Sequence, residues 1–579
     1  MDSLYKFNIL SKKHFRIALF VILILATIFL RVYKINSIPP GLYQDETAIG
    51  YNAYSILQTG KDEYGAKYPL YFKSFGDYKL PVYIYTSSFF IKLFGMNEYA
   101  VRLPSVISGI LGVAILFFLV KYLTRNISLA YIAGFFLAIN PLHLQFSRAG
   151  FEVNFALTAT LLGTLLFILG VEKKKLPYLF LSILAFAISL YSYNLTRLLS
   201  PLILFGCAFL YFKKLKSFKQ SELFLLVFFS FLLVLPFTLS FFTQSGIYSA
   251  TSNLITGQEI VAKNIEFRSY LSSTPQIFVK FFYNKYIFQV FKYFENLATI
   301  LSGTFYFVSG SDHPNHGIGD IGIFYLFELP FFITGIVAFF SKKLKSLRIF
   351  FFWLIASVLV LALSKDVPHA TRGYFIIVPE IVFSSLGVLI FLQWLKTMPN
   401  KLYRVLILVG VLCFVFYNIQ YYFTSYYFRF PSVYAANWRF SDKTLSDYLA
   451  KVSPSYDKII INDKTDFIYT SLLFYTSYPP RDFIKSVVRY KDGSLIKVRS
   501  FGKYEFRSIN WEKDELLPNT LFITTVMDKP FHAPVLKNIT NPTRQVAIEA
   551  NDSILQFPKT DVAYVIIDSK DLQNKLLKK

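Results

Sequence analysis

Long apolar runs separated by short basic clusters make up most of this chain, and this alternation restricts its fold more than any other feature. A helix that spans a bilayer needs about 20 predominantly apolar residues. Eleven segments of the chain fit or approach that length. They lie near residues 16–34, 102–120, 128–145, 153–171, 176–193, 199–212, 222–241, 321–340, 348–364, 374–395 and 403–423. The pattern therefore predicts an α-helical polytopic membrane protein with about eleven spans.

Basic residues recur at every second connection between these runs. The clusters lie near the N-terminus and at residues 121–125, 172–175, 213–219, 341–348 and 396–404. Because cytoplasmic loops of membrane proteins are enriched in Lys and Arg, we expect all six clusters, and the N-terminus, on the cytoplasmic side. The expected location is a bacterial plasma membrane. The first apolar run resembles a signal peptide, but no small-residue cleavage site follows it, so we interpret it as a first span.

The net charge of +25 at first suggests a nucleic-acid partner. The basic residues, however, lie in clusters between apolar runs rather than on one amphipathic face, and 54% of the chain is hydrophobic. The charge distribution thus fits the bilayer and excludes nucleic acid. Cys207 and Cys413 both fall inside apolar runs, where we expect small hydrophobic side chains rather than a disulfide.

The charge alternation places three longer segments outside the membrane, namely a first outer loop at 35–101, a second at 242–320 and a tail at 424–579. Within the first loop, residues 81–94 are aromatic and amphipathic but too short for a confident span. They predict a helix that lies along the membrane interface.

The composition changes in the tail, where apolar runs shorten to the length of strands. Strands are expected at 458–462, 521–525 and 563–567, and a helix at 442–451. The tail is therefore predicted to be a small extracytoplasmic α/β domain, residues 424–579, attached to a transmembrane domain, residues 1–423. No Gly-rich turn follows a predicted strand, so the tail has no nucleotide-binding fingerprint.

Two adjacent carboxylates, Asp45 and Glu46, follow the first span in the first outer loop. A carboxylate at the membrane surface can accept a proton from a sugar or protein hydroxyl. Asp45 could also cap a helix that begins at Glu46, and the two interpretations are compatible. Further along the loop, Lys79 precedes the interfacial helix, where its ammonium can meet a phosphate or simply extend to the headgroups.

Several ionisable residues stand at the predicted outer helix ends, against the general charge bias. Such residues usually face a cavity or a partner. Arginines that converge there would form a phosphate clamp, because a guanidinium makes bidentate contacts to oxygens. The basic candidates are Arg148, Arg197 and Arg372, and Glu152 is expected to hold Arg148 or to line the acceptor site.

Half of the six histidines, His313, His316 and His369, also lie in predicted outer segments. The spacing of His313 and His316, next to Asp312, is compatible with a metal site, but polar contacts to a donor or acceptor and a structural turn are alternatives. The chain contains no Asp-x-Asp sequence, the usual signal of a metal-bridged diphosphate. We therefore predict no metal or cofactor, and divalent metal remains an alternative.

These segments together resemble the membrane-embedded C-type glycosyltransferases, in particular the protein O-mannosyltransferase and aminoarabinose transferase group, families 39 and 83. The likeness is carried by the first span and by Gly41–Glu46, Lys79–Pro81, Leu93–Glu98 and Arg102–Ser105, and it follows the topology to about residue 423. It implies a polyprenyl-phosphate sugar as donor and an outward-facing cavity. Asp45 would then match the catalytic acidic residue and Lys79 the lysine that meets the lipid phosphate. Glu152 occupies the region of a second acidic residue.

The resemblance and the residues together predict an inverting transfer of a sugar to a hydroxyl of a protein, lipid or envelope glycan. Asp45, with Glu46 beside it, would act as the base, while the basic candidates would neutralise the leaving phosphate. Tyr43, Tyr51 or Tyr374 could stack on the sugar.

Two other classes of function are open to a chain of this kind. A sugar-lipid transporter or flippase would carry polar groups near the middle of the bilayer, often in repeated halves. Here the ionisable residues lie at the outer ends, and no repeat is visible. A surface receptor would not need so many spans.

Overall fold

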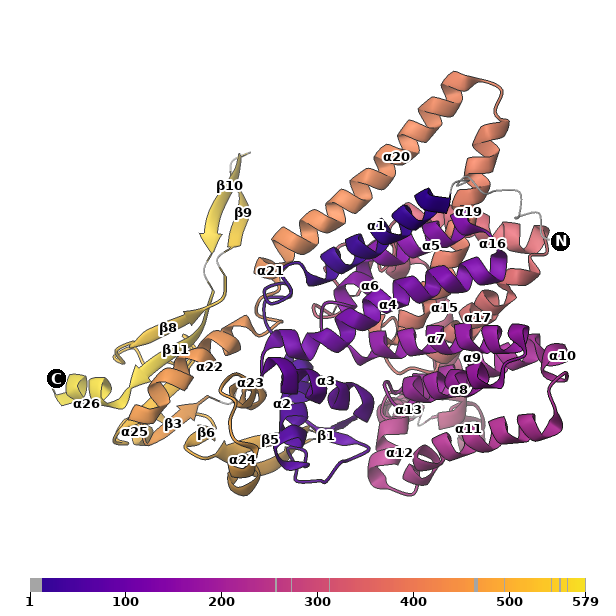
Figure 1. The fold of residues 1–579 in the computed structure, drawn as a ribbon. Coiled ribbons are helices and arrows are strands. Elements are labelled where there is room, and N and C mark those ends of the chain that lie inside the picture. The colour runs from indigo at the N-terminus through magenta and orange to yellow at the C-terminus, as the bar shows by residue number, and fades with distance from the viewer. Residues whose placement is uncertain are drawn as a thin grey trace. The chain divides into compact units, whose positions relative to one another are not determined.

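The computed structural model describes residues 13–577 except 256–257, 272, 312, 463–466, 494, 543, 551–552 and 560 (Figure 1). Contacts divide the chain into two compact units. The helical unit contains Met1–Tyr33, Ser105–Ser147 and Phe151–Phe423, and the α/β unit contains Lys34–Pro104, Arg148–Gly150 and Thr424–Lys579. The division into domains 1–423 and 424–579 stays a prediction, and these two units are discontinuous in the sequence. The first outer loop, however, belongs to the same unit as the tail.

Among the described residues, seven helical segments are long and apolar enough to cross a membrane. They contain α1 (Lys13–Val32), α4 (Glu98–Thr124), α7 (Glu152–Lys173), α11 (Gln220–Ser240), α17 (Arg348–Ala362), α19 (Ile377–Thr397) and α20 (Lys401–Thr424). Shorter apolar helices are α5 (Ile127–Ile139), α8 (Leu176–Leu190), α9 (Thr196–Leu210) and α16 (Glu328–Ser341). Each of the eleven predicted ranges overlaps one of these helices. The helical fold class is thereby confirmed, while the number of crossings stays a prediction.

The predicted range 128–145 is not one continuous helix. Helix α5 ends at Ile139, and a short helix, α6 (Pro141–Phe146), begins directly afterwards. Proline lacks the N–H that a continuing helix would need, and it fits the first position of a new one. The Asn140 side chain caps this new helix by accepting a hydrogen bond from the backbone N–H of His143 at 2.9 Å.

Helices α16 and α19 pack with almost no side chain between their backbones at two points. A Cβ added at Gly335 would lie 1.9 Å from the carbonyl oxygen of Phe383, and one at Gly387 would lie 1.8 Å from that of Phe331. Between helices inside a membrane there is no hydrophobic driving force, so their association depends on close packing. Small residues allow this packing because they let the two backbones approach each other. These two glycines therefore fix this helix pair.

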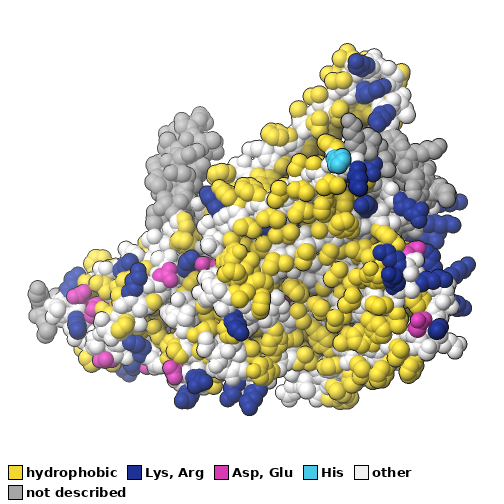
Figure 2. Space-filling model, viewed as in Figure 1, with side chains coloured by type: hydrophobic (Ala, Val, Ile, Leu, Met, Phe, Trp, Pro, Cys, Tyr) yellow, Lys and Arg dark blue, Asp and Glu magenta, His cyan; other side chains and the backbone are white. Residues whose placement is uncertain are grey.

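The remaining elements of the helical unit are short. The second outer loop contains α12 (Gln244–Thr251), α13 (Gln258–Ser269), α14 (Gln276–Phe282), α15 (Lys285–Leu301) and the π-helical turn Phe305–Ser309. Elsewhere lie α10 (Phe212–Leu215), α18 (Ala370–Gly373) and the 3-10 turns Lys345–Leu347 and Tyr374–Ile376. Figure 2 shows that Lys and Arg side chains gather at the right-hand end of the molecule, beside a broad apolar surface.

In the α/β unit, the first outer loop forms two helices and a small hairpin. Helix α2 (Gln44–Thr59) is followed by β1 (Phe72–Ser74), β2 (Asp77–Lys79) and α3 (Pro81–Phe94). Helix α3 has the bounds predicted for the interfacial helix. Its apolar residues Phe89, Leu93 and Phe94 are 50–58% exposed, and its position at the membrane interface stays a prediction.

The tail forms a seven-stranded mixed sheet in the order β4-β5-β6-β3-β7-β11-β8. The predicted strands correspond to β3 (Lys458–Ile461), β7 (Thr520–Thr524) and β11 (Val562–Asp568), and the predicted helix to α22 (Phe440–Val452), which confirms the sheet-containing tail. Strand β3 runs parallel to both of its neighbours. The other strands are β4 (Val488–Asp492), β5 (Leu495–Phe501), β6 (Tyr504–Phe506), β8 (Lys537–Thr540) and the separate hairpin β9 (Arg544–Ala550) with β10 (Ser553–Lys559). The other tail helices are α21 (Phe430–Val433), α23 (Ile468–Tyr475), α24 (Pro480–Ser486), α25 (Trp511–Asp514) and α26 (Ser569–Leu577), and a π-helical turn covers Ser425–Arg429.

Helix α2 and the tail share one hydrophobic core. Ala48 and Tyr51 of α2 are buried in the same cluster as Leu472 and Leu473 of α23. A Cβ at Gly50 would lie 2.4 Å from the ring of Phe474, so a larger residue at Gly50 would force this ring away. The acidic start of α2 is therefore held by packing that involves residues more than 400 positions away in the sequence.

Candidate active site

Asp45 and Lys79 form an ion pair in the α/β unit. The Lys79 Nζ donates to Asp45 Oδ1 at 2.7 Å, and the side chains of Asp45 and Lys79 are 36% and 11% exposed. Asp45 stands in the first turn of α2, and Lys79 ends β2. The turn between β1 and β2 requires left-handed backbone at Phe75 and Gly76, with φ of 54° and 100°. The hairpin thus brings the lysine to the one carboxylate of the pair that solvent can reach.

Helix α2 begins at Gln44 with Tyr43 in the capping position, so Asp45 is not the cap. The alternative interpretation of Asp45 as a structural cap is therefore wrong. The N-cap N–H of Tyr43 instead donates to Glu46 Oε2 at 3.3 Å. Asp45 still lies where the positive end of the helix dipole favours its charge.

Glu46 lies in a different environment, with no exposed surface. Its Oε1 accepts from the Nε of Arg102 at 3.0 Å and from the backbone N–H of Gly150 at 2.7 Å. Burial raises the pKa of Glu46, while the charge of Arg102 and the hydrogen bonds oppose that shift. Because donors already surround this carboxylate, its geometry favours a positioning role over contact with a substrate.

Arg102 is a residue that the sequence-based site did not include. It is fully buried and donates to the carbonyl oxygens of Ile35 at 2.6 Å, Pro39 at 3.2 Å and Gly41. The arginine therefore fixes the path of the chain into α2. An ionisable residue at the first position of the predicted apolar run 102–120 was the available signal, since such residues are expensive to bury without a function.

A second buried contact joins the start of α4 to the tail. Glu98 Oε1 accepts from Lys443 Nζ at 2.5 Å and from the hydroxyl of Tyr475 at 3.3 Å. The same hydroxyl accepts from the backbone N–H of Leu42 at 3.3 Å. Sequence analysis missed this contact because nothing in the sequence pairs residue 98 with residues 443 and 475.

Arg148 has no exposed surface, although it was predicted to contact phosphate. It donates to the carbonyl oxygen of Ile38 at 2.9 Å, and its guanidinium lies over the rings of Tyr426 and Tyr427 at 5.7 and 5.3 Å. The predicted sugar-stacking Tyr43 is also buried, edge-on to Trp438. In this conformation both residues support the loop rather than line an open site.

The predicted histidines come together in the helical unit. The rings of His313 and His316 are 4.3 Å apart, and those of His316 and His369 are 5.0 Å apart. Arg372 lies near them and is held by Asp366 at 3.0 Å and by the side chain of Asn253 at 3.1 Å. We call His313, His316, His369 and Arg372 the histidine cluster.

Burial and the charge of Arg372 lower the pKa of two of these imidazoles, those of His316 and His369. Burial lowers the pKa of His316 well below its usual value and that of His369 to about 3. Nδ1 of His316 is buried and has no hydrogen-bond partner among the described residues. The cluster can therefore offer one fixed cation and neutral hydrogen-bonding nitrogens to an anionic or hydroxyl-bearing ligand.

The other predicted residues of the helical unit lie apart from these contacts. The guanidinium of Arg197 stacks over Phe237 at 5.1 Å, and Glu152 begins α7. Tyr374 is buried, and its hydroxyl donates to Asn154 at 2.9 Å, so it does not present a face to a sugar. Asp312 lies outside the described residues. No group of three or more metal-ligating side chains occurs among the residues that the structure describes.

Comparison with known proteins shows which family and which fold this chain is similar to. Residues 79–239 match the family model of the dolichyl-phosphate-mannose-protein mannosyltransferases. YycA of Bacillus subtilis (strain 168), a candidate mannosyltransferase, is 27% identical over 201 residues, which cover 34% of this chain and 27% of that protein. The match thus spans about a quarter of this curated relative's length.

Among solved structures, ArnT from Cupriavidus metallidurans bound to undecaprenyl phosphate gives a TM-score of 0.50 at 12% identity, covering 96% of this chain and 98% of ArnT. The archaeal oligosaccharyltransferase AglB from Archaeoglobus fulgidus, in complex with an inhibitory peptide and a dolichol-phosphate, gives 0.49 at 13% identity and covers 80% of this chain and 64% of that chain. The likeness to ArnT concerns the fold. Fold and family match together confirm the predicted resemblance to the membrane-embedded C-type glycosyltransferases, and the apolar helices make this an integral membrane protein.

Proposed function

We propose that this protein is a glycosyltransferase that moves a sugar from a polyprenyl-phosphate donor to a hydroxyl acceptor. The observation that carries the proposal is the Asp45–Lys79 pair, which joins a solvent-accessible carboxylate to an ammonium at 2.7 Å. A transfer of this kind needs a base for the acceptor and a cation for the leaving phosphate. The matched family is named for a dolichyl-phosphate-mannose donor, and the related fold of ArnT binds undecaprenyl phosphate.

In the proposed reaction, the Asp45 carboxylate takes the proton of the acceptor hydroxyl as its oxygen attacks the anomeric carbon. The bond between that carbon and the phosphate oxygen breaks, and the electron pair leaves with the polyprenyl phosphate. Attack from the face opposite the phosphate inverts the configuration of the sugar. Lys79 stabilises the charge that develops on the leaving group, and no covalent intermediate on the protein is required.

Glu46 and Arg102 are proposed as positioning residues. Their buried pair fixes the loop carbonyls and the first turn of α2, on which Asp45 stands. A catalytic group has to be held within a fraction of an ångström of its productive geometry by its neighbours. Within the helical unit, the histidine cluster is proposed as a polar surface of its own, where Arg372 meets a phosphate and the imidazoles of His316 and His369 meet sugar or acceptor hydroxyls.

The acceptor is proposed to be a protein, lipid or envelope glycan at the outer face of a bacterial plasma membrane. This placement relies on the basic clusters, which put the N-terminus in the cytoplasm and the tail outside. Because the tail packs on α2, it forms part of the framework of the proposed site rather than a separate appendage.

A transfer assay distinguishes this proposal from transport. Vesicles that contain the purified protein and a polyprenyl-phosphate mannose labelled in the sugar are incubated with envelope acceptors from cells lacking the gene. We expect the label to leave the lipid fraction and to enter the acceptors, with release of polyprenyl phosphate. Label that crosses the bilayer while still attached to its lipid would instead indicate a flippase. Mass analysis of envelope glycans with and without the gene then identifies the sugar and the acceptor.

A further inference from the structure

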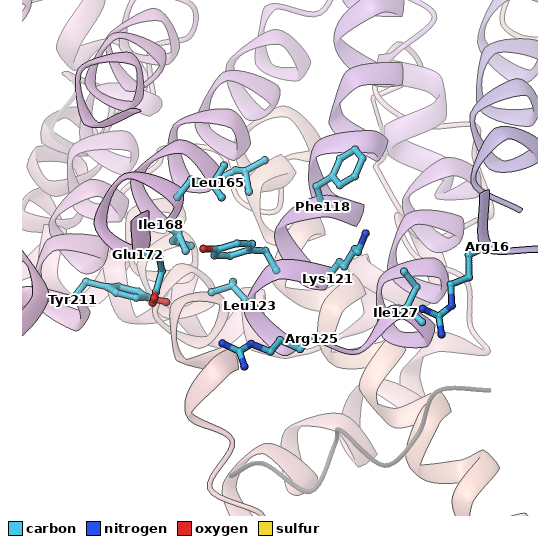
Figure 3. A pocket seen from close by; sticks show the side chains of 12 residues that line it. Arg16, Phe118, Lys121, Leu123, Arg125, Ile127, Leu165, Ile168, Glu172 and Tyr211 are labelled. Carbon is cyan, nitrogen blue, oxygen red and sulfur yellow. The ribbon is translucent and has the colours of Figure 1, made fainter. Parts of the chain in front are cut away.

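A cavity of about 670 Å³ opens at the helix ends of the helical unit that carry basic clusters (Figure 3). Its walls come from α1, from the C-terminal end of α4 and the start of α5, from α7 and from the residue after α9. Ligand sites in proteins commonly have volumes of about 300–1,000 Å³. The cavity contains no residue of the Asp45–Lys79 pair or of the histidine cluster.

Three cations line this cavity, namely Arg16, Lys121 and Arg125. Lys121 and Arg125 are exposed, and neither makes an ion pair in the described part of the chain. The one acidic side chain in the lining, Glu172, is bound to Lys214. The cavity therefore has an excess of positive charge that an anionic group would offset.

Apolar side chains form the other side of the cavity. Figure 3 shows Phe118 and Leu165 along its upper edge, Arg125 at its lower edge and Arg16 at its right-hand edge. The Phe118 side chain is 44% exposed. Leu162, which lies one turn before Leu165 on α7, is 38% exposed. On helices long enough to cross a membrane, such surface faces acyl chains. The apolar wall is therefore continuous with the surface that lipid covers.

Basic residues continue around the same end of the unit. A second cavity is lined by Lys213, Lys214, Lys345 and Arg348, and it shares Tyr211 with the first. Residues of several predicted cytoplasmic clusters thus surround neighbouring hollows. Basic pockets between membrane helices on the cytoplasmic side are suited to anionic lipid headgroups.

We propose that this cavity binds an anionic phospholipid, with the phosphodiester between Lys121 and Arg125 and one acyl chain along Phe118 and Leu165. A soluble anion would leave the apolar wall unused, and a zwitterionic lipid would leave the excess charge unpaired. The site differs in residues and ligand from the proposed transfer site. It would anchor the basic helix ends to the anionic leaflet.

Native mass spectrometry of the full-length detergent-purified protein tests the site. Binding of palmitoyl-oleoyl phosphatidylglycerol is compared with binding of the phosphatidylcholine that has the same chains. We expect selective binding of phosphatidylglycerol, and in the variant Lys121→Gln/Arg125→Gln an affinity about 25-fold lower, since each basic residue near a membrane surface contributes on the order of fivefold. The charge-keeping variant Lys121→Arg/Arg125→Lys should bind like the wild type.

The matched control is Lys342→Gln/Lys401→Gln, which removes two exposed cations that line neither cavity. The proposal is overturned if this control loses as much affinity, if both lipids bind equally, or if millimolar inorganic phosphate displaces the lipid completely. Arg125→Gln alone, at an exposed position, should lower the affinity about fivefold and keeps the test valid if the double variant does not fold. Unchanged binding in that single variant would also contradict the site.

Discussion

Asp45 and Glu46 are adjacent in the sequence, yet they lie in opposite environments. Glu46 is fully buried, is paired with Arg102 and accepts two backbone hydrogen bonds, whereas Asp45 is partly exposed and paired with Lys79. Successive residues of a helix point about 100° apart, so one faces the core when the other faces outward. The comparison shows that two adjacent acidic residues of one motif can have different roles. Glu46 stabilises the loop, whereas Asp45 remains accessible to a substrate.

The largest expected effect is on the buried pair. Glu46→Ala leaves the Arg102 charge buried without its carboxylate, and we expect a loss of about 3–5 kcal/mol in the free energy of unfolding. A double-mutant cycle with Arg102→Met, followed by thermal unfolding in detergent, measures the coupling. The control Asp77→Ala, on an exposed strand residue, should change little. Strictly additive losses in the cycle would contradict the assignment of Glu46 and Arg102 as one unit.

The buried carboxylate of Glu63, close to α2, extends this comparison because its ionisation makes the free energy of unfolding depend on pH. Glu63 is buried, accepts from Asn52 at 3.1 Å, and burial raises its pKa from 4.5 to about 7. Because the folded state holds this proton more tightly than the unfolded state, the site destabilises the fold as pH rises from about 4.5 to about 7. We expect ionisation of Glu63 to lower the free energy of unfolding of the wild type by about 3 kcal/mol across this pH range. We expect no such decrease in Glu63→Gln.

Unfolding free energies measured at several pH values between 4.5 and 8 check this expectation. Glu505→Gln serves as the control, because this carboxylate is 29% exposed and paired with Lys458 and Arg507. Identical pH profiles for the wild type and Glu63→Gln would show that Glu63 is ionised in the folded protein throughout this range.

The exposed pair is broken by Lys79→Gln. We expect kcat/KM for a polyprenyl-phosphate sugar to fall about 10- to 100-fold, equivalent to about 1.4–2.7 kcal/mol, because the leaving phosphate loses its cation. The unfolding midpoint should change little, in contrast to the buried pair. Lys67→Gln, an exposed lysine of the same loop, is the control. Full activity of Lys79→Gln at saturating and limiting donor would exclude a role for this ammonium.

A smaller effect is expected in the histidine cluster. Arg372 is already bound to Asp366, so part of its charge is offset before any ligand arrives. Arg372→Gln should therefore raise KM for the donor about fivefold to tenfold with a smaller change in kcat. Lys365→Gln, which removes an exposed cation nearby, is the control. An unchanged KM would show that Arg372 does not contribute to donor binding and has only a structural role.

The sequence was most informative where local pattern determines structure. Run length and charge alternation located the eleven apolar helices that occur among the described residues, and aromatic amphipathicity located α3 at Pro81–Phe94. The break at Asn140 was missed because apolar composition continues across it, although Pro141 was the available signal.

The sequence could not reveal which candidates are buried. The direction in which Glu46 and Arg148 point depends on contacts with Arg102 and with Tyr426, far away along the chain. Likewise, the packing of α2 against α23 results from long-range contacts that no periodicity records. Each residue of the histidine cluster was a separate candidate in the sequence, but the lowered pKa values of His316 and His369 follow from burial that only the structure displays.

The most direct test of the central claim is the rate of sugar transfer by Asp45→Asn, measured at equal amounts of folded protein and saturating donor. The account predicts a decrease of about 10²- to 10⁴-fold, the usual contribution of a positioned base, with an unfolding midpoint close to that of the wild type. The isosteric amide keeps the size of the side chain but cannot take the proton of the acceptor. A transfer rate equal to that of the wild type would contradict Asp45 as the base and, with it, the division of tasks between the two carboxylates.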